Sequence, residues 1–146
     1  GVKASTGNLL CFLDADDIWS ADKVERQIRI MDQTQISFGR IQEFFDSTVQ
    51  IQGSPRVMPG YSPITMMIKK EDYIHVGDFN EDLAVAEFVD WLSRAKHLNM
   101  SMTIDQEIYA FRRIHAGNIG RLNKPNASHY AVSLKAALDR KRSQSS

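Results

Sequence analysis

The sequence predicts an α/β fold in one domain spanning residues 1–146. Two observations predict it. A short apolar run over 8–13 leads through an acidic loop into an amphipathic helix, which is the strand-loop-helix unit of α/β proteins. A second amphipathic segment over 86–98 is followed by residues that alternate in polarity as strands do. A chain of this length buries one core and is too short for two full domains.

The composition is that of a soluble globular protein, with 42% hydrophobic and 25% charged residues. Eighteen basic residues balance eighteen acidic ones, so no global field favours nucleic acid or an anionic membrane. No window approaches the roughly 18 apolar residues of a membrane span. The single cysteine, Cys11, is interpreted as a small buried apolar residue. It has no second cysteine with which to form an intrachain disulfide, which fits a reducing compartment. We therefore expect a cytoplasmic protein whose function resides in a local site.

The first helix is expected over about 21–33, after an N-cap at Ser20. Its apolar residues Val24, Ile28 and Met31 recur at helical spacing, so they should form the face that packs on the core. Trp19 precedes the cap and is expected to pack, with the lining of a binding cleft as the alternative.

Apolar or alternating runs bounded by turn residues predict the later elements. In order they are two or three short strands within 35–58, a strand over 64–68, a helix over about 69–75, a helix over 86–98, two strands within 102–112, and a C-terminal amphipathic helix with a frayed tail over 128–146. Gly77 should end the third of these, because glycine accepts a left-handed conformation. Trp91 should be buried in the helix over 86–98.

Three aspartates, Asp14, Asp16 and Asp17, follow the first strand directly. Like charges at this density repel, and hard cations such as Mg²⁺ and Mn²⁺ prefer carboxylate oxygen. The end of a strand is also where α/β sheets place ligands. The spacing therefore predicts a metal site for a diphosphate, and the alternative is a solvated acidic turn that caps the next helix.

A resemblance to the family 2 glycosyltransferases, which have the GT-A fold, is carried by ASTGNLLCFLDADDIWSADKVERQI. The family signature has a Gly-x-x-x-x-Phe-Leu-Asp-Ala-Asp-Asp-x-Trp block before a Lys-x-Glu-x-Gln helix. Three further segments resemble the family in the expected order: GYSPITMMIKKEDYIHVGDFNEDL, AEFVDWLSRA and FRRIHAGNIGR. The resemblance implies a truncated GT-A fold, with a mixed, mostly parallel sheet and flanking helices.

The implied activity is transfer of a sugar from a nucleotide diphosphate sugar to an acceptor hydroxyl, with inversion and with Mn²⁺ or Mg²⁺. On the matching positions Asp16 and Asp14 would bind the metal, and Asp14 would also lie near the ribose or sugar of the donor. Asp17 would support the metal site or the donor. A metal on the diphosphate neutralises charge that develops on the leaving group.

Inverting transfer also needs a base to take the acceptor proton. In many family members that base is an aspartate at the position of Phe88 here, so Glu87 is the first replacement and Asp90 the second. A structural role for either is the alternative, since Asp90 and Arg94 have the spacing of an ordinary helical ion pair.

The segment near the end of the resemblance supplies two further donor-binding residues. His115 would meet the diphosphate or the metal, unless it is an ordinary hydrogen-bonded surface group. Arg112 and Arg113 stand where a strand should end, so one of them could pair with phosphate or with the acidic loop. We assign Arg112 to the donor.

The resemblance corresponds to the second part of the family's domain. We therefore expect the nucleotide-binding half to be missing and the isolated chain to turn over little or no donor. The alternative function is a non-catalytic binding or assembly module. Its sheet edge would pair with another copy, since an uncovered strand is a template for pairing.

Overall fold

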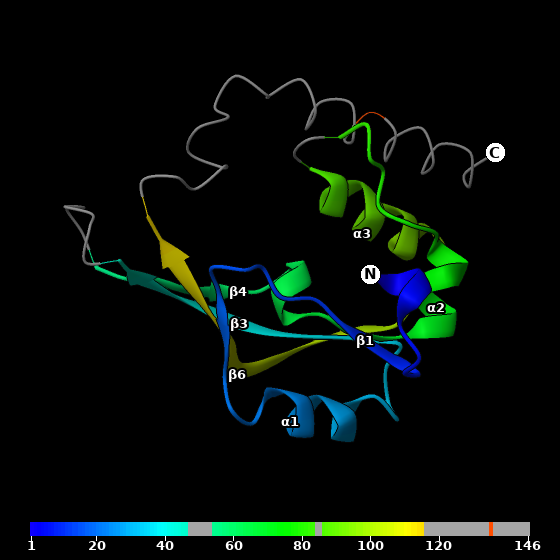
Figure 1. Cartoon of the computed structure of the whole chain (residues 1–146). Coiled ribbons are helices and arrows are strands. Elements are labelled where there is room, and N and C mark those ends of the chain that lie inside the picture. The colour runs from blue at the N-terminus through cyan, green and yellow to red at the C-terminus, as the bar shows by residue number, and fades with distance from the viewer. Residues whose placement is uncertain (47–53, 84–85, 116–134, 136–146) are drawn as a thin grey trace. The chain divides into compact units, whose positions relative to one another are not determined.

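The computed structural model describes residues 1–46, 54–83, 86–115 and 135 (Figure 1). The chain divides into two compact units, one made of Gly1–Asp72 with Ser101–Ala116 and the other of Tyr73–Met100 with Gly117–Ser146. Apart from residue 135, the helix expected over 128–146 lies outside the described residues, as does part of the β region expected over 35–58. The assignment of 1–146 to a single partial domain stays a prediction.

The first unit is built on a mixed sheet. Its strands are β1 (Leu9–Cys11), β2 (Ile18–Trp19), β3 (Ile36–Phe45), β4 (Val57–Pro59), β5 (Met67–Lys69) and β6 (Met102–Ile114). They are ordered β1-β5-β3-β6-β2, and β4 pairs with β3. Two short 3₁₀ segments, Val2–Ala4 and Pro63–Thr65, accompany them. The α/β class and the mixed sheet with flanking helices are confirmed.

Parallel pairing within the described residues is confined to β3 and β6, which run side by side from Ile36 and Met102 to Phe45 and Ile114. The other four pairings are antiparallel. The sheet is therefore less parallel than the resemblance implies. Parallel neighbours need a long crossover connection, and the segment between β3 and β6 supplies one that contains two helices.

The two longest strands replace shorter expected ones. β3 runs unbroken through Gly39 where two or three short strands were expected within 35–58, and β6 joins the two strands expected within 102–112. The register of the pair shifts beside Gly39. A Cβ atom at Gly39 would lie 2.1 Å from Cδ2 of Tyr109, so the glycine makes room for that buried ring.

The helix α1 (Lys23–Ile30) buries a different face from the one that the sequence predicts. Val24 and Ile28 are 42% and 49% exposed, whereas Lys23 and Gln27 are fully buried. The reason is a set of long-range hydrogen bonds. Nε2 of Gln27 donates to the carbonyl oxygens of Ser37 (3.0 Å) and Thr65 (2.9 Å). The expected packing of Val24 and Ile28 was therefore wrong, although Met31 is buried.

The start of α1 also differs from expectation, because its N-cap is Asp22 and not Ser20. Trp19 packs against Ile41, Ile64 and Ala110, and its Nε1 donates to the carbonyl oxygen of Ile64 at 2.8 Å. This contact supports the packing role of Trp19.

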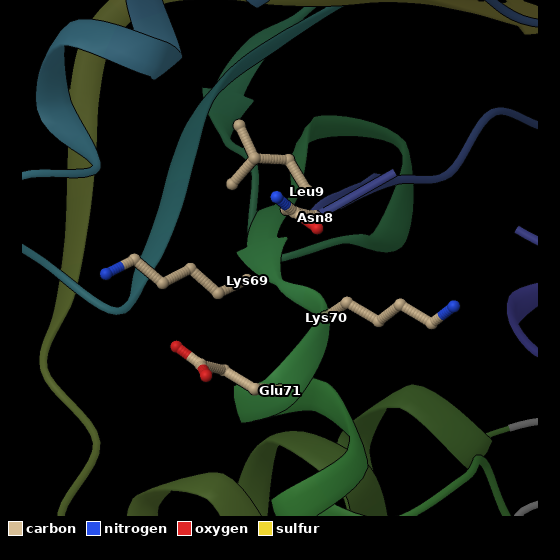
Figure 2. A pocket seen from close by; sticks show the side chains of 5 residues that line it. All are labelled: Asn8, Leu9, Lys69, Lys70 and Glu71. Carbon is tan, nitrogen blue, oxygen red and sulfur yellow. The ribbon is translucent and has the colours of Figure 1, made fainter. Parts of the chain in front are cut away.

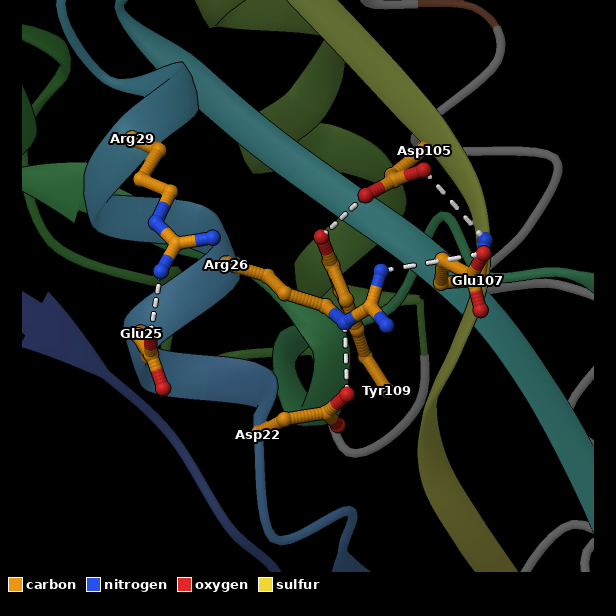
Figure 3. Close-up of polar contacts among 7 residues, drawn as sticks. All are labelled: Asp22, Glu25, Arg26, Arg29, Asp105, Glu107 and Tyr109. Atoms are coloured by element: carbon orange, nitrogen blue, oxygen red, sulfur yellow. Dashed lines mark hydrogen bonds and ion pairs between the residues drawn. The ribbon is translucent and has the colours of Figure 1, made fainter.

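Polar side chains tie α1 to β6 (Figure 3). Arg26 lies between Asp22, at 2.5 Å, and Glu107, at 3.7 Å. The hydroxyl of Tyr109 donates to Asp105 on the same strand. Burial, first of all, and this contact with Asp105 raise the pKa of Tyr109, so its hydroxyl keeps the proton that it donates to Asp105.

The second unit has an aromatic core. It contains the end of α2 (Lys70–Val76) and α3 (Glu87–His97), close to the helices expected over 69–75 and 86–98. Trp91 is fully buried and stacks on Tyr73 and Phe88, with ring centroids 5.6 Å and 6.0 Å away. Gly77 has a φ of 89°, and its N–H donates to the carbonyl of Tyr73 at 3.0 Å, as expected for a helix end.

Within the part of the chain that the structure describes, no helix is long and apolar enough to cross a membrane.

Candidate functional site

The acidic loop between β1 and β2 forms a turn, in which the N–H of Asp17 donates to the carbonyl of Asp14 at 3.2 Å. The end of β6 meets this turn. Oδ2 of Asp16 lies 2.9 Å from Nε2 of His115, which directly follows β6. Oδ1 of Asp17 accepts the main-chain N–H of Arg113 at 3.0 Å. Residues about a hundred positions apart are therefore brought together at one end of the sheet.

A cavity of about 420 Å³ opens beside these contacts. It is lined by Ala15, Asp16, Asp46, Arg113 and His115. Asp16 and His115, both predicted site residues, therefore lie together at the wall of this cavity. Concave sites with a few convergent polar groups are the usual places for small ligands.

Asp46 is absent from the predicted site, and Arg113 was named only as one of two arginines that could pair with phosphate or with the acidic loop. Nη1 of Arg113 lies 3.1 Å from Oδ2 of Asp46, and Nε of Arg113 donates to the carbonyl of Asp16 at 3.1 Å. The spacing of Arg113 two residues before His115 offered a signal, because alternate strand residues share a face. No local pattern links Asp46 to the loop. The link comes from the parallel register, which pairs Phe44 with Arg113.

The electrostatics of the three loop carboxyls differ. Partial burial, first of all, and the charge of Asp16 raise the pKa of Asp14. Burial also raises the pKa of Asp17, although the N–H of Arg113 opposes the shift. The hydrogen bond with His115 lowers the pKa of Asp16. Asp16 is thus the member of the loop most firmly held as a carboxylate.

Arg112 is exposed. Its positive charge favours the ionised form of all three loop aspartates, so it opposes the rise in the pKa of Asp14 and Asp17 and adds to the lowering for Asp16. It contributes to the field at the site, and the contacts that fix the loop come from Arg113. The donor-binding role of Arg112 stays a prediction.

The fit of a metal ion can be tested on the donor atoms. In the described residues no three side chains of the His, Cys, Asp and Glu types gather to hold an ion. Asp16 and His115 offer a carboxylate and an imidazole, and the side chain of Asp16 is 43% exposed. Mg²⁺ usually takes only one or two protein carboxylates, with substrate phosphates and water completing its shell. The residues therefore fit an ion shared with a diphosphate, and do not form a closed protein centre.

The predicted bases lie in the second unit, on the first turn of α3. Glu87 is half-buried at the first position of the helix. Asp90 is 7% exposed, and its Oδ2 accepts Nε of Arg94 at 3.0 Å. Arg94 also donates to the carbonyls of Val76 and Asp78. The Asp90–Arg94 pair thus braces the loop after α2, which supports the structural role for Asp90.

A second cavity, of about 380 Å³, lies where β1, β5 and α2 meet and contains none of the predicted residues (Figure 2). Lys69 and Lys70 line it, and their side chains point to opposite sides. Nζ of Lys70 donates to the carbonyl of Ser5 at 2.5 Å. The two ammonium groups therefore do not converge on one ligand.

A mixed α/β sheet thus carries the acidic loop at one end, beside the cavity lined by Asp16 and His115. The family model described as Glycosyl transferase family 2 matches residues 1–91, and the chain belongs to this family. No curated protein matches the chain. Membership supports glycosyltransferase activity in general, with a nucleotide-sugar donor and an acceptor as its partners. The matched residues include the acidic loop, whereas Arg113 and His115 lie beyond them.

Proposed function

We propose that this chain serves metal-dependent, inverting transfer of a sugar from a nucleotide diphosphate sugar to an acceptor hydroxyl. The observation that carries the proposal is the contact of Asp16 with His115 at the wall of a cavity, 2.9 Å apart. A carboxylate and an imidazole facing one another beside open space are suited to share a cation with a ligand.

Asp16 and His115 are the residues that would hold Mn²⁺ or Mg²⁺, with Asp14 beside them. The ion, when bound, supplies positive charge to the diphosphate as it leaves. Asp14 would contact the ribose or sugar of the donor. Asp17 keeps the loop in place through the N–H of Arg113, and the exposed guanidinium of Arg112 is available to the diphosphate.

Glu87 is the proposed base for the acceptor hydroxyl. Asp90 is the weaker candidate, because its carboxylate already accepts a hydrogen bond from Arg94 and is largely shielded from water. Glu87→Gln is expected to lower kcat in an active form of the enzyme and to leave donor binding unchanged. A Glu87→Gln variant with wild-type kcat would remove Glu87 from this role.

Calorimetric titration of the full chain with Mn²⁺, with and without uridine diphosphate, tests the donor site. Asp16→Ala should abolish the binding that depends on both components. Asp22→Ala is the matched control, since Asp22 is a half-exposed aspartate that pairs with Arg26 on α1. Binding to Asp16→Ala at wild-type affinity would contradict the proposed site.

Self-assembly is the second candidate function, favoured by the place of β1 in the sheet. Within the described residues β1 pairs with β5 and ends the strand order. Leu9 is 36% exposed there and Leu13, just beyond the strand, is 46% exposed. Pairing of this edge with a second copy would give a homo-oligomer. Light scattering that reports a monomer at high concentration would contradict it.

A further inference from the structure

Arg113 stands where three segments of the first unit meet. Its main-chain N–H donates to Oδ1 of Asp17, and its side-chain Nε donates to the carbonyl of Asp16. Its Nη1 pairs with Oδ2 of Asp46, just after β3. One residue of β6 thus contacts both the acidic loop and the end of β3.

The side-chain contacts of Arg113 use two different nitrogens of the guanidinium. Nε and Nη1 lie in one plane at a fixed separation, and each contacts an oxygen at 3.1 Å. The guanidinium carbon also lies 5.5 Å from the ring centre of Phe44, the residue opposite Arg113 in the parallel register. A planar fork on an aromatic ring is a geometry that a lysine ammonium cannot reproduce.

The main chain at Asp46 is fixed by a hydrogen bond that does not involve Arg113. The N–H of Asp46 donates to the carbonyl of Ile114 at 3.0 Å, which extends the β3–β6 pairing by one residue. Its side chain is 20% exposed, compared with 39% for Arg113. Asp46 therefore offers a fixed and largely shielded carboxylate that draws the guanidinium of Arg113 to one place.

We propose that Arg113 is a positioning residue, which with Asp46 as its counter-ion fixes the main chain at Asp16 so that the Asp16 carboxylate faces the donor's metal and diphosphate. The inference rests on the proposed function of the acidic loop. Arg113 acts through Asp16 and Asp17, which it contacts directly. Residues that orient metal ligands typically matter 10–100-fold for metal affinity.

The test compares Arg113→Lys, Arg113→Gln and Asp46→Asn with the wild-type chain. The probe is Mn²⁺ titrated in the presence of uridine diphosphate. Both Arg113 variants should bind about 10-fold more weakly or worse, because lysine keeps the charge but loses the fork. Asp46→Asn should change affinity in the same direction and by less. Arg29→Gln is the matched control, since this arginine on α1 is 72% exposed and pairs with Glu25.

A second readout separates positioning from stability and needs no turnover. In ¹H–¹⁵N spectra, Arg113→Lys should shift the amide signals of residues 14–17 and leave those of α3 unchanged. The main-chain N–H of Arg113 remains in every variant, so its contact with Asp17 can persist. Urea unfolding of each variant shows whether the loop signals move in a chain that is still folded.

The outcomes are distinct. Arg113→Lys with wild-type affinity would overturn the inference, because a point charge would then suffice. Wild-type affinity in both Arg113 variants, together with loss of binding in Asp16→Ala, would overturn positioning and leave the proposed function standing. Absence of binding by the wild-type chain would remove the proposed function, and the inference with it.

Discussion

Replacement of Lys23 by methionine is expected to stabilise the protein. Lys23 lies on α1 with no exposed surface, and its Nζ finds no oxygen or nitrogen acceptor among the described residues. The amino group of Lys23 instead lies over the ring of Trp19, with Nζ 4.4 Å from the ring centre, and near the thiol of Cys11. Burial lowers the pKa of Lys23, and the charge of Cys11 opposes this shift.

The magnitude follows from two opposing terms. An unsatisfied buried polar group costs about 1–3 kcal/mol. The contact of the amine with the Trp19 ring returns about 0.5–2 kcal/mol. Methionine keeps an unbranched apolar chain against the same neighbours, so Lys23→Met should raise the free energy of unfolding by about 1 kcal/mol at pH 7.

The pH dependence has a definite sign. Between the lowered pKa of folded Lys23 and its ordinary value of about 10.4, the unfolded chain binds a proton that the folded chain does not. Wild-type stability therefore rises with pH in this window, by at most about 1.4 kcal/mol per pH unit for this one group. Lys23→Met lacks the contribution, so its advantage over wild type should shrink as pH rises.

Urea unfolding followed by far-UV circular dichroism at pH 7 and pH 9 measures both effects. Burial raises the pKa of Cys11, so this thiol also contributes to the pH dependence, and repeating the comparison in a Cys11→Ala background removes its contribution. Lys69→Met, on an exposed lysine of β5, should change stability by less than about 0.5 kcal/mol. A loss of more than about 1 kcal/mol in Lys23→Met, with unchanged pH dependence, would refute the reasoning, because the amine would then be charged and paired.

Three further outcomes are expected. Gly39→Ala should lower stability by about 2 kcal/mol in thermal unfolding, because the new Cβ would lie 2.1 Å from Tyr109. Asp90→Asn should lower stability by about 1.5–3 kcal/mol in urea unfolding, because Arg94 would lose its charged acceptor. Mn²⁺ and uridine diphosphate should bind more weakly in titrations at pH 5 than at pH 7. The pKa values of Asp14 and Asp17 are raised, so these carboxyls begin to take up protons at a higher pH than usual, and a protonated carboxyl binds metal poorly.

Each of the two stability predictions has a matched control substitution. Gly7→Ala places its Cβ no nearer than 3.7 Å to Leu9, so it should leave the melting temperature close to wild type. Asp82→Asn, at an exposed position, should likewise leave stability unchanged. A melting temperature for Gly39→Ala equal to that of Gly7→Ala would count against the tight packing of Tyr109, and equal affinity at pH 5 and pH 7 against the role of the loop carboxyls.

The sequence by itself determined the helices close to 69–75 and 86–98 and where the acidic loop lies. The spacing of apolar residues predicted the helix over 86–98 with Trp91 on its buried face. The left-handed conformation that glycine accepts predicted that α2 ends at Gly77. The order of four family segments indicated the family before any contact was known. These are local properties, since they depend on residues within a few positions of one another.

Tertiary structure decided which face of α1 is buried and which residues complete the site. Gln27 is buried because its amide satisfies carbonyls 10 and 38 residues away, and this outweighs the apolar stripe of Val24 and Ile28. Arg113 and Asp46 meet only because β3 and β6 pair in parallel in one register. Hydrogen-bond partners at such separations leave no periodic trace in the sequence, so the partners of Gln27 and the pairing of Arg113 with Asp46 become evident only in the folded chain.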